Sequence, residues 1–149
     1  MDTNDSLLSE IQTLLRSKLF GVLATQGTEY PYCSLVGFAA SEDARSLYFA
    51  TLRETRKYKN LSDIPRVSLL IDDQANQASD LSRARALTVL GIALEVGQDV
   101  REDALALYLR KHPHLEEFVT ASNCALVRIQ VSNYILVSNF QRVREYTMQ

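Results

Sequence analysis

The feature that most constrains the fold is a succession of strand-like segments joined by turns too short to contain a helix. Residues 19–25 and 32–40 are rich in apolar and β-branched side chains, and a polar turn at 26–29 separates them. A second short turn at residues 41–45 leads to a third strand at 46–51. Strands connected this closely pair antiparallel, because a parallel pair needs a long crossover connection. The first third of the chain therefore predicts an antiparallel sheet.

The remainder of the chain adds strands and places helices around them. Gly91, inside a long strand segment, indicates a bulge or a bend. About six strands, mostly in hairpin order, fit a barrel or a sandwich with peripheral helices better than a doubly wound fold. The remaining predicted elements are strands at 66–72, 84–96 and 125–137, a bend at Ser132-Asn133, helices near the N-terminus, around 56–61 and at 100–111, and a polar loop at 73–82.

Composition limits the size, environment and partners of the protein. A length of 149 residues without a linker or repeat is expected for one domain, residues 1–149. The net charge of −2, without a long basic run, argues against binding to nucleic acid. No segment approaches the ~20 apolar residues that span a membrane, and the N-terminus lacks an apolar signal core. Cys33 and Cys124 are too far apart for a CxxC motif, so we expect free thiols in a cytoplasmic protein.

The most informative polar segment begins where the third strand ends at Thr51. The following helix opens with Thr55, Arg56 and Lys57. The first turn of a helix has unpaired backbone N–H groups and a partial positive charge, so an anion placed there would meet those groups and both cations. Cations in the first turn destabilise a helix unless an anion is bound there. A phosphate site is one interpretation of this segment, and a solvated basic helix face is the other.

Other catalytic and binding motifs are absent from the sequence. It contains no GxGxxG, GxxxxGK[ST] or GxSxG pattern, which removes the usual signatures of dinucleotide, P-loop and α/β-hydrolase sites. His112 and His114 flank a proline, but no third histidine is present, so no metal site is predicted. No residue stands out as a general acid or base, and the catalytic residues are left unassigned.

Five segments, in this order, resemble the pyridoxamine 5'-phosphate oxidase-like, FMN-binding split-barrel family. The resemblance covers about residues 10–97 well and the last strands loosely. It implies a mainly β fold, a six-stranded antiparallel split β-barrel with peripheral α-helices, in which two copies form a homodimer. The segments are Gly21-Val22-Leu23-Ala24-Thr25, Pro31-Tyr32-Cys33-Ser34-Leu35-Val36, Tyr48-Phe49-Ala50-Thr51, Thr55-Arg56-Lys57-Tyr58-Lys59-Asn60-Leu61 and Pro65-Arg66-Val67-Ser68-Leu69-Leu70-Ile71.

The resemblance also implies a cofactor site for FMN between the two subunits, which the partner subunit completes. Three of the matching residues belong to the strand that runs along the flavin ring, where much of the contact is through the backbone. Four others match the group that holds the phosphate, and the last, an asparagine, either joins that group or only braces the helix. The ring-side residues are Ser34, Leu35 and Val36, the phosphate-holding residues are Thr51, Thr55, Arg56 and Lys57, and the asparagine is Asn60.

The expected function is that of an FMN-dependent oxidoreductase acting on an unidentified small molecule. The true oxidases of the family carry Trp and an Arg-Leu-x-Pro element near the C-terminus, and this chain has no Trp, so pyridoxamine phosphate is not the expected substrate. A haem-using branch has a ligating histidine in a C-terminal extension, and this chain has no histidine after His114. The alternatives are a non-catalytic flavin-binding protein, a split barrel that binds a deazaflavin or haem, and a dimerisation module without a ligand.

Overall fold

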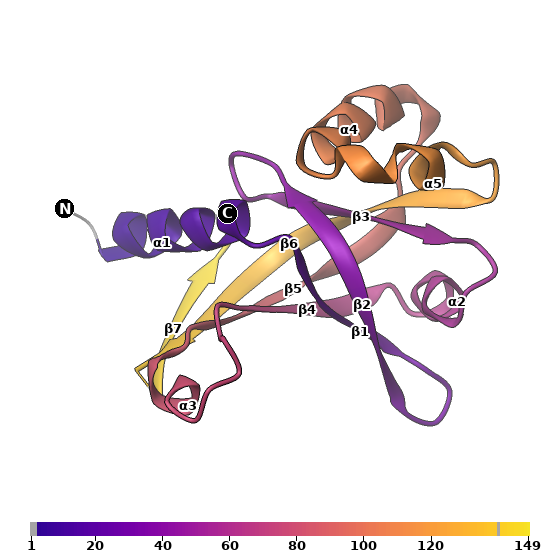
Figure 1. Ribbon diagram of the computed structural model, residues 1–149. Coiled ribbons are helices and arrows are strands. Elements are labelled where there is room, and N and C mark those ends of the chain that lie inside the picture. The colour runs from indigo at the N-terminus through magenta and orange to yellow at the C-terminus, as the bar shows by residue number, and fades with distance from the viewer. Residues whose placement is uncertain (1–2, 140) are drawn as a thin grey trace.

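The strands form one antiparallel sheet that closes on itself, in a computed structural model that describes residues 3–139 and 141–149 (Figure 1). The strand order is β3-β2-β1-β4-β5-β6-β7, and β3 also pairs with β6. This pairing closes six strands into a barrel and leaves β7 outside it, which confirms the predicted barrel. The strands are β1 (Phe20–Gln26), β2 (Pro31–Ala40), β3 (Ser46–Leu52), β4 (Arg66–Asp72), β5 (Ala86–Glu95), β6 (Cys124–Ser138) and β7 (Arg142–Thr147).

The barrel is split between β2 and β3. These two strands pair only through residues 38–40 of β2, whereas β3 pairs with β6 over residues 46–52. The earlier residues of β2, 31–37, pair with β1 alone. Figure 1 shows the β1–β2 hairpin extending away from the end of β3, where the chain enters α2 (Arg56–Asp63). The split therefore leaves one edge of β2 open beside this helix.

The interior of the barrel is filled by alternate residues of each strand, as the period of two in a strand requires. Leu23, Phe38 and Phe49 are fully buried there. The helix α1 (Thr3–Ser17) packs on the same core through Ile11 and Leu14. Burying each side chain of this size contributes about 1.5–3 kcal/mol, so the barrel and α1 form one packed unit.

The remaining helices lie at the ends and on the outside of the barrel. The pair α4 and α5 covers β3 and the start of β6 (Figure 1), with a second apolar cluster that includes Tyr108 and Leu126. The Tyr108 hydroxyl donates to the Gly37 carbonyl at 3.0 Å, and the His112 Nε2–H donates to the Phe38 carbonyl at 2.8 Å. The remaining helices are α3 (Asp80–Arg83), α4 (Gln98–Lys111), η1 (Pro113–Leu115) and α5 (Glu116–Thr120).

Most predicted elements are confirmed, with differences that have physical causes. The bulge predicted from Gly91 is present, but the extra residue is Ser132 on β6, since Leu90 pairs with Asn133 and Gly91 with Val131. A Cβ at Gly91 would collide with the carbonyl oxygen of Gln130, so the strands approach closely there. The predicted bend at Ser132-Asn133 is this bulge, and β6 continues through it.

Four elements of the described structure differ from what the sequence predicts. The loop predicted at 73–82 ends in the short helix α3, and η1, α5 and β7 had not been predicted. β7 is largely exposed and carries charges on both faces, so it lacks the alternation that identifies a half-buried strand. Among the described residues, no helix is long and apolar enough to cross a membrane.

Candidate functional site

A pair of threonine hydroxyls joins the end of β3 to the start of α2. Thr55 is the N-cap of α2, with extended backbone angles (φ −83°, ψ 157°), and its Oγ1 accepts from the Tyr58 N–H at 3.4 Å. The same oxygen lies 2.8 Å from Thr51 Oγ1 and donates to the Leu52 carbonyl at 2.8 Å. The structure thus brings together two of the predicted phosphate-holding residues and fixes where the helix begins.

The two cations that open α2 have no acidic partner in the part of the chain that the structure describes. The first turn of α2 contains no acidic residue, and neither Arg56 nor Lys57 takes part in an ion pair there. The guanidinium of Arg56 lies over the ring of Tyr32, with 5.1 Å from Cζ to the ring centroid. This contact connects α2 to β2 across the split. Positive charge is therefore concentrated at a helix N-terminus, where it is least favourable without an anion.

A neighbouring cation, Arg53, is paired, and sequence reasoning did not identify it. Its guanidinium lies 2.6 Å from a carboxylate oxygen of Glu95, and the Tyr58 hydroxyl donates to the other oxygen at 2.6 Å. The hydrogen bond from Arg53 lowers the pKa of Glu95, and the hydrogen bond to Glu95 raises the pKa of Tyr58. Glu95 lies far from Arg53 in sequence, so no local signal reveals this pair. It attaches the start of α2 to β5.

Asn60 holds the middle of α2 against the barrel. Its side chain is only 8% exposed, and its Nδ2 donates to Thr25 Oγ1 on β1 at 3.0 Å. The hydroxyl of Thr25 is itself buried, so this bond satisfies two polar groups that lack access to water. The structure shows Asn60 as a brace for α2, and direct contact with a cofactor remains a prediction.

The three predicted ring-side residues on β2 point to both faces of the strand. Leu35 is opposite Val22 on the outward face and is 68% exposed, whereas Ser34 and Val36 face the interior side with Leu23. The Oγ of Ser34 is buried without a hydrogen-bond partner in the described structure. Adjacent strand residues cannot present one side-chain surface, so any common ligand would contact this segment through its open backbone edge.

Leu35 instead belongs to an apolar outer face of the barrel, which spans β2, β1, β4 and β5. Val22 is opposite both Leu35 and Leu70 in the sheet, so these side chains are neighbours. A cavity of about 650 Å³ adjoins this face and is lined by both leucines and by Gln74 from the loop after β4. The exposed members of this outer face are Phe20, Val22, Leu35, Leu70, Ile92 and Leu94.

The histidines lie away from α2, near the end of α4. His112 is buried, its Nε2–H is used by the Phe38 carbonyl, and burial lowers its pKa. His114 is exposed. In the described part of the chain, no group of three His, Cys, Asp or Glu side chains could hold a metal ion.

An antiparallel six-stranded barrel that is open between two of its strands places the chain in the split-barrel class. The chain belongs to the pyridoxamine 5'-phosphate oxidase family, whose model matches residues 7–137. The family therefore covers the barrel, α2 and α4, and it agrees with the resemblance seen in the sequence. A comparison with curated protein sequences finds no match.

Solved structures share this fold at low sequence identity. A heme binding protein from Mycobacterium smegmatis superposes with a TM-score of 0.85 at 21% identity, covering 99% of this chain and 59% of that one. ChuZ from Campylobacter jejuni gives 0.79 at 14% identity, covering 99% and 61%. A FAD-binding protein from Mesorhizobium loti gives 0.69 at 18% identity, covering 86% and 90%. The present chain thus spans about three-fifths of the first two proteins.

Proposed function

We propose that this protein binds FMN, with the FMN phosphate at the N-terminus of α2. The observation that carries this proposal is that Arg56 and Lys57 form no ion pair among the described residues, at a helix whose first turn contains no acidic residue. A phosphate there would accept hydrogen bonds from backbone N–H groups and pair with both cations. Its negative charge would offset the positive charge at the helix N-terminus. Arg56 offers a two-pronged donor, and Lys57 adds a compact charge. Thr51 and Thr55 fix the geometry of the helix start.

The open edge of β2 supports a place for the flavin ring beside this phosphate site. Residues 31–37 of β2 pair with β1 alone, and Ser34 has a buried hydroxyl without a partner among the described residues. A ring with polar edges along this strand would form hydrogen bonds with that hydroxyl and with backbone groups on the open edge of β2. The residues present therefore fit FMN: Ser34, Leu35 and Val36 would line the ring, and the start of α2 would bind the phosphate.

We propose that a second copy of the chain covers the apolar outer face and completes the site. Phe20 and Leu35 are 59% and 68% exposed in the single chain, and both lie on adjacent strands of that face. A contiguous apolar surface of this kind marks an interaction site. Leu35 lies on the outer face while Ser34 and Val36 point inward, so a cofactor held along β2 would also be close to the partner subunit. Equilibrium sedimentation should give a dimer, and Leu35→Glu should yield monomer.

Flavin chemistry would make the protein an oxidoreductase. FMN supplies hydride or electron transfer when bound, and the protein supplies grip, orientation and exclusion of water. Arg56 and Lys57 would bind the FMN phosphate, and β2 would orient the flavin ring. Reduction of bound flavin by NADH or NADPH, followed by reoxidation by an added acceptor, separates an enzyme from a non-catalytic flavin-binding protein.

The deciding experiment is a titration of apo protein with FMN, followed by flavin fluorescence. We expect saturable binding, weakened about a hundredfold in Arg56→Ala/Lys57→Ala because two charge-assisted contacts to phosphate are lost. The matched control is Arg110→Ala/Arg142→Ala, which removes two exposed cations elsewhere and should bind as the unaltered chain does. Absence of binding by the unaltered protein, or equal binding by both double variants, contradicts the proposal.

Haem is the second candidate, because the structure with a TM-score of 0.85 is described as a heme binding protein. The described residues offer less for haem than for FMN, since the Nε2 of the buried His112 is occupied by the Phe38 carbonyl. Addition of haemin should therefore produce no saturable Soret shift. A shift that persists in Arg56→Ala/Lys57→Ala would favour haem over FMN.

A further inference from the structure

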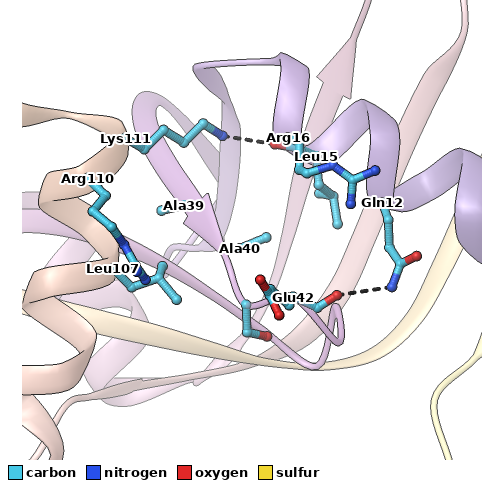
Figure 2. A pocket seen from close by; sticks show the side chains of 10 residues that line it. Gln12, Leu15, Arg16, Ala39, Ala40, Glu42, Leu107, Arg110 and Lys111 are labelled. Atoms are coloured by element: carbon cyan, nitrogen blue, oxygen red, sulfur yellow. Dashed lines mark hydrogen bonds between the residues drawn. The ribbon is translucent and has the colours of Figure 1, made fainter.

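A cleft of about 620 Å³ opens between α1 and α4, beside the end of β2 that is remote from α2. This volume lies within the range of about 300–1,000 Å³ that is usual for small-molecule sites. Figure 2 shows Lys111 and Arg110 extending from α4, with Gln12 and Arg16 on the α1 side. The apolar part of the lining comprises Leu15, Ala39, Ala40 and Leu107.

Lys111 carries a half-buried positive charge with no carboxylate partner in the described structure. Its Nζ donates to the Leu15 carbonyl at 2.9 Å and lies 3.9 Å from the centre of the Phe38 ring. An ammonium group has three donors, and this carbonyl accepts from one of them. Burial lowers the pKa of Lys111 to about 8, which reflects the cost of keeping the charge away from water. An anion in the cleft would reduce that cost.

The charges around Lys111 leave the cleft positive. Arg110 precedes it on the last turn of α4, Arg16 lies on α1, and Glu42 lies on the turn after β2. Glu42 forms no ion pair with these cations among the described residues, and its backbone carbonyl accepts from Gln12 Nε2 at 3.0 Å. Three cations and one carboxylate therefore share one hollow.

Helix electrostatics explain part of this arrangement. Cations are favoured in the last turn of a helix, and the contact of Lys111 with a carbonyl of α1 is favourable for the same reason. These helix effects account for the positions of the cations, but they do not account for the apolar hollow between α1 and α4. The combination of apolar lining and excess positive charge is instead that of a site for an amphipathic anion.

We propose that this cleft binds a small organic monocarboxylate with an apolar body, at a site separate from the flavin site. The carboxylate would accept from Lys111 and Arg110, and the apolar body would lie on Ala39, Ala40 and Leu107. Glu42 would repel a second negative charge on the ligand, which favours a monoanion over a dianion. The site depends on no feature of α2, so the FMN proposal and this one can fail independently.

The test is a titration of the full chain, ¹⁵N-labelled, with sodium hexanoate, followed by amide chemical shifts. We expect saturable shifts centred on Ala39, Ala40 and Lys111. Arg110→Gln and Lys111→Met should each weaken binding about tenfold, because each removes a charge-assisted hydrogen bond. Glu42→Gln should strengthen it, because a repulsive charge is removed. Arg142→Gln, on β7, is the matched control and should have no effect.

Three outcomes overturn the proposal. Equal binding of hexanol or hexylamine would show an apolar hollow without anion selectivity, and weaker hexanoate binding by Glu42→Gln would show that Glu42 attracts the ligand. No saturable shift by the unaltered chain would show that the cleft has no such ligand. If Lys111→Met loses its folded spectrum, Arg110→Gln and Glu42→Gln decide the result, since both side chains are exposed at the rim.

Discussion

The two halves of β2 are held in opposite ways. Residues 38–40 pair with β3, and the side chains of Tyr108, on α4, and His112, just after it, donate to the carbonyls of Gly37 and Phe38. Residues 31–36 pair with β1 alone, and they include an exposed leucine and a buried hydroxyl without a described partner. One strand thus has an anchored half, from residue 37 on, which other parts of the chain hold through hydrogen bonds, and an open half, whose outer backbone edge is available to a ligand or a partner.

The largest difference between the halves should come from removing a core side chain of the anchored half. Phe38 is fully buried, so Phe38→Ala should lower the free energy of unfolding by about 3–5 kcal/mol through lost burial and a cavity. Urea denaturation measures this loss. A cost below about 0.5 kcal/mol, within the range of ordinary surface changes, would mean that the two halves are not distinct.

The second effect concerns the brace that holds α2 beside the open half. Asn60→Ala leaves the buried Thr25 hydroxyl without its donor, which should cost about 1–3 kcal/mol. The same change should weaken FMN binding by displacing the start of α2. Asn123→Ala is the matched control, because Asn123 is exposed and bonds to Glu54 at 3.3 Å. Equal stability of the two variants would show that α2 needs no brace.

A pH-dependent effect tests the burial of Lys111 on α4, whose Nζ lies over the ring of Phe38 in the anchored half. Its pKa is lowered by burial from 10.5 to about 8, so between these values the unfolded chain holds a proton that the folded protein has released. The contribution of Lys111 to the free energy of unfolding therefore rises with pH across this interval. Arg16, Arg110, Glu42 and His112 surround Lys111 and are retained in the comparison.

This contribution is measured by denaturation from pH 7.5 to 10.5, as a difference between the unaltered chain and Lys111→Met. We expect the unaltered chain to gain stability relative to the variant as pH rises. Lys59→Met, which removes an exposed lysine of α2, gives the baseline. A difference that stays flat, or that falls with pH, would contradict burial of the Lys111 charge.

The smallest effect on stability should come from the open half. Leu35→Ala removes a side chain that is already 68% exposed, so the free energy of unfolding of dilute protein should change by no more than about 0.5 kcal/mol. The change should appear instead as weaker self-association in equilibrium sedimentation. A loss of stability as large as that of Phe38→Ala would place Leu35 in the core and remove the contrast.

The sequence predicted the barrel because its signals are local. Apolar runs, short turns and Gly91 each act within a few residues, and the start of α2 was readable from Thr55 and the cations after it. The resemblance assigns Ser34 and Leu35 to the flavin ring largely through their backbone, and the structure adds that their side chains point to opposite faces of β2. The Arg53–Glu95 pair and the Lys111 cleft depend on segments far apart in sequence, which only the folded barrel brings together.

The strand β7 has a consequence for solubility. Closure of the barrel removes free sheet edges outside the split, but β7 pairs with β6 on one side only and so adds another edge. The charged side chains of Arg142, Arg144 and Glu145 discourage further strands from adding there. A chain shortened before Arg142 would instead expose the edge of β6 from Asn133 to Ser138, with Ile135 and Val137 along it. Such a chain should aggregate by edge-to-edge pairing, even though the closed barrel itself is intact.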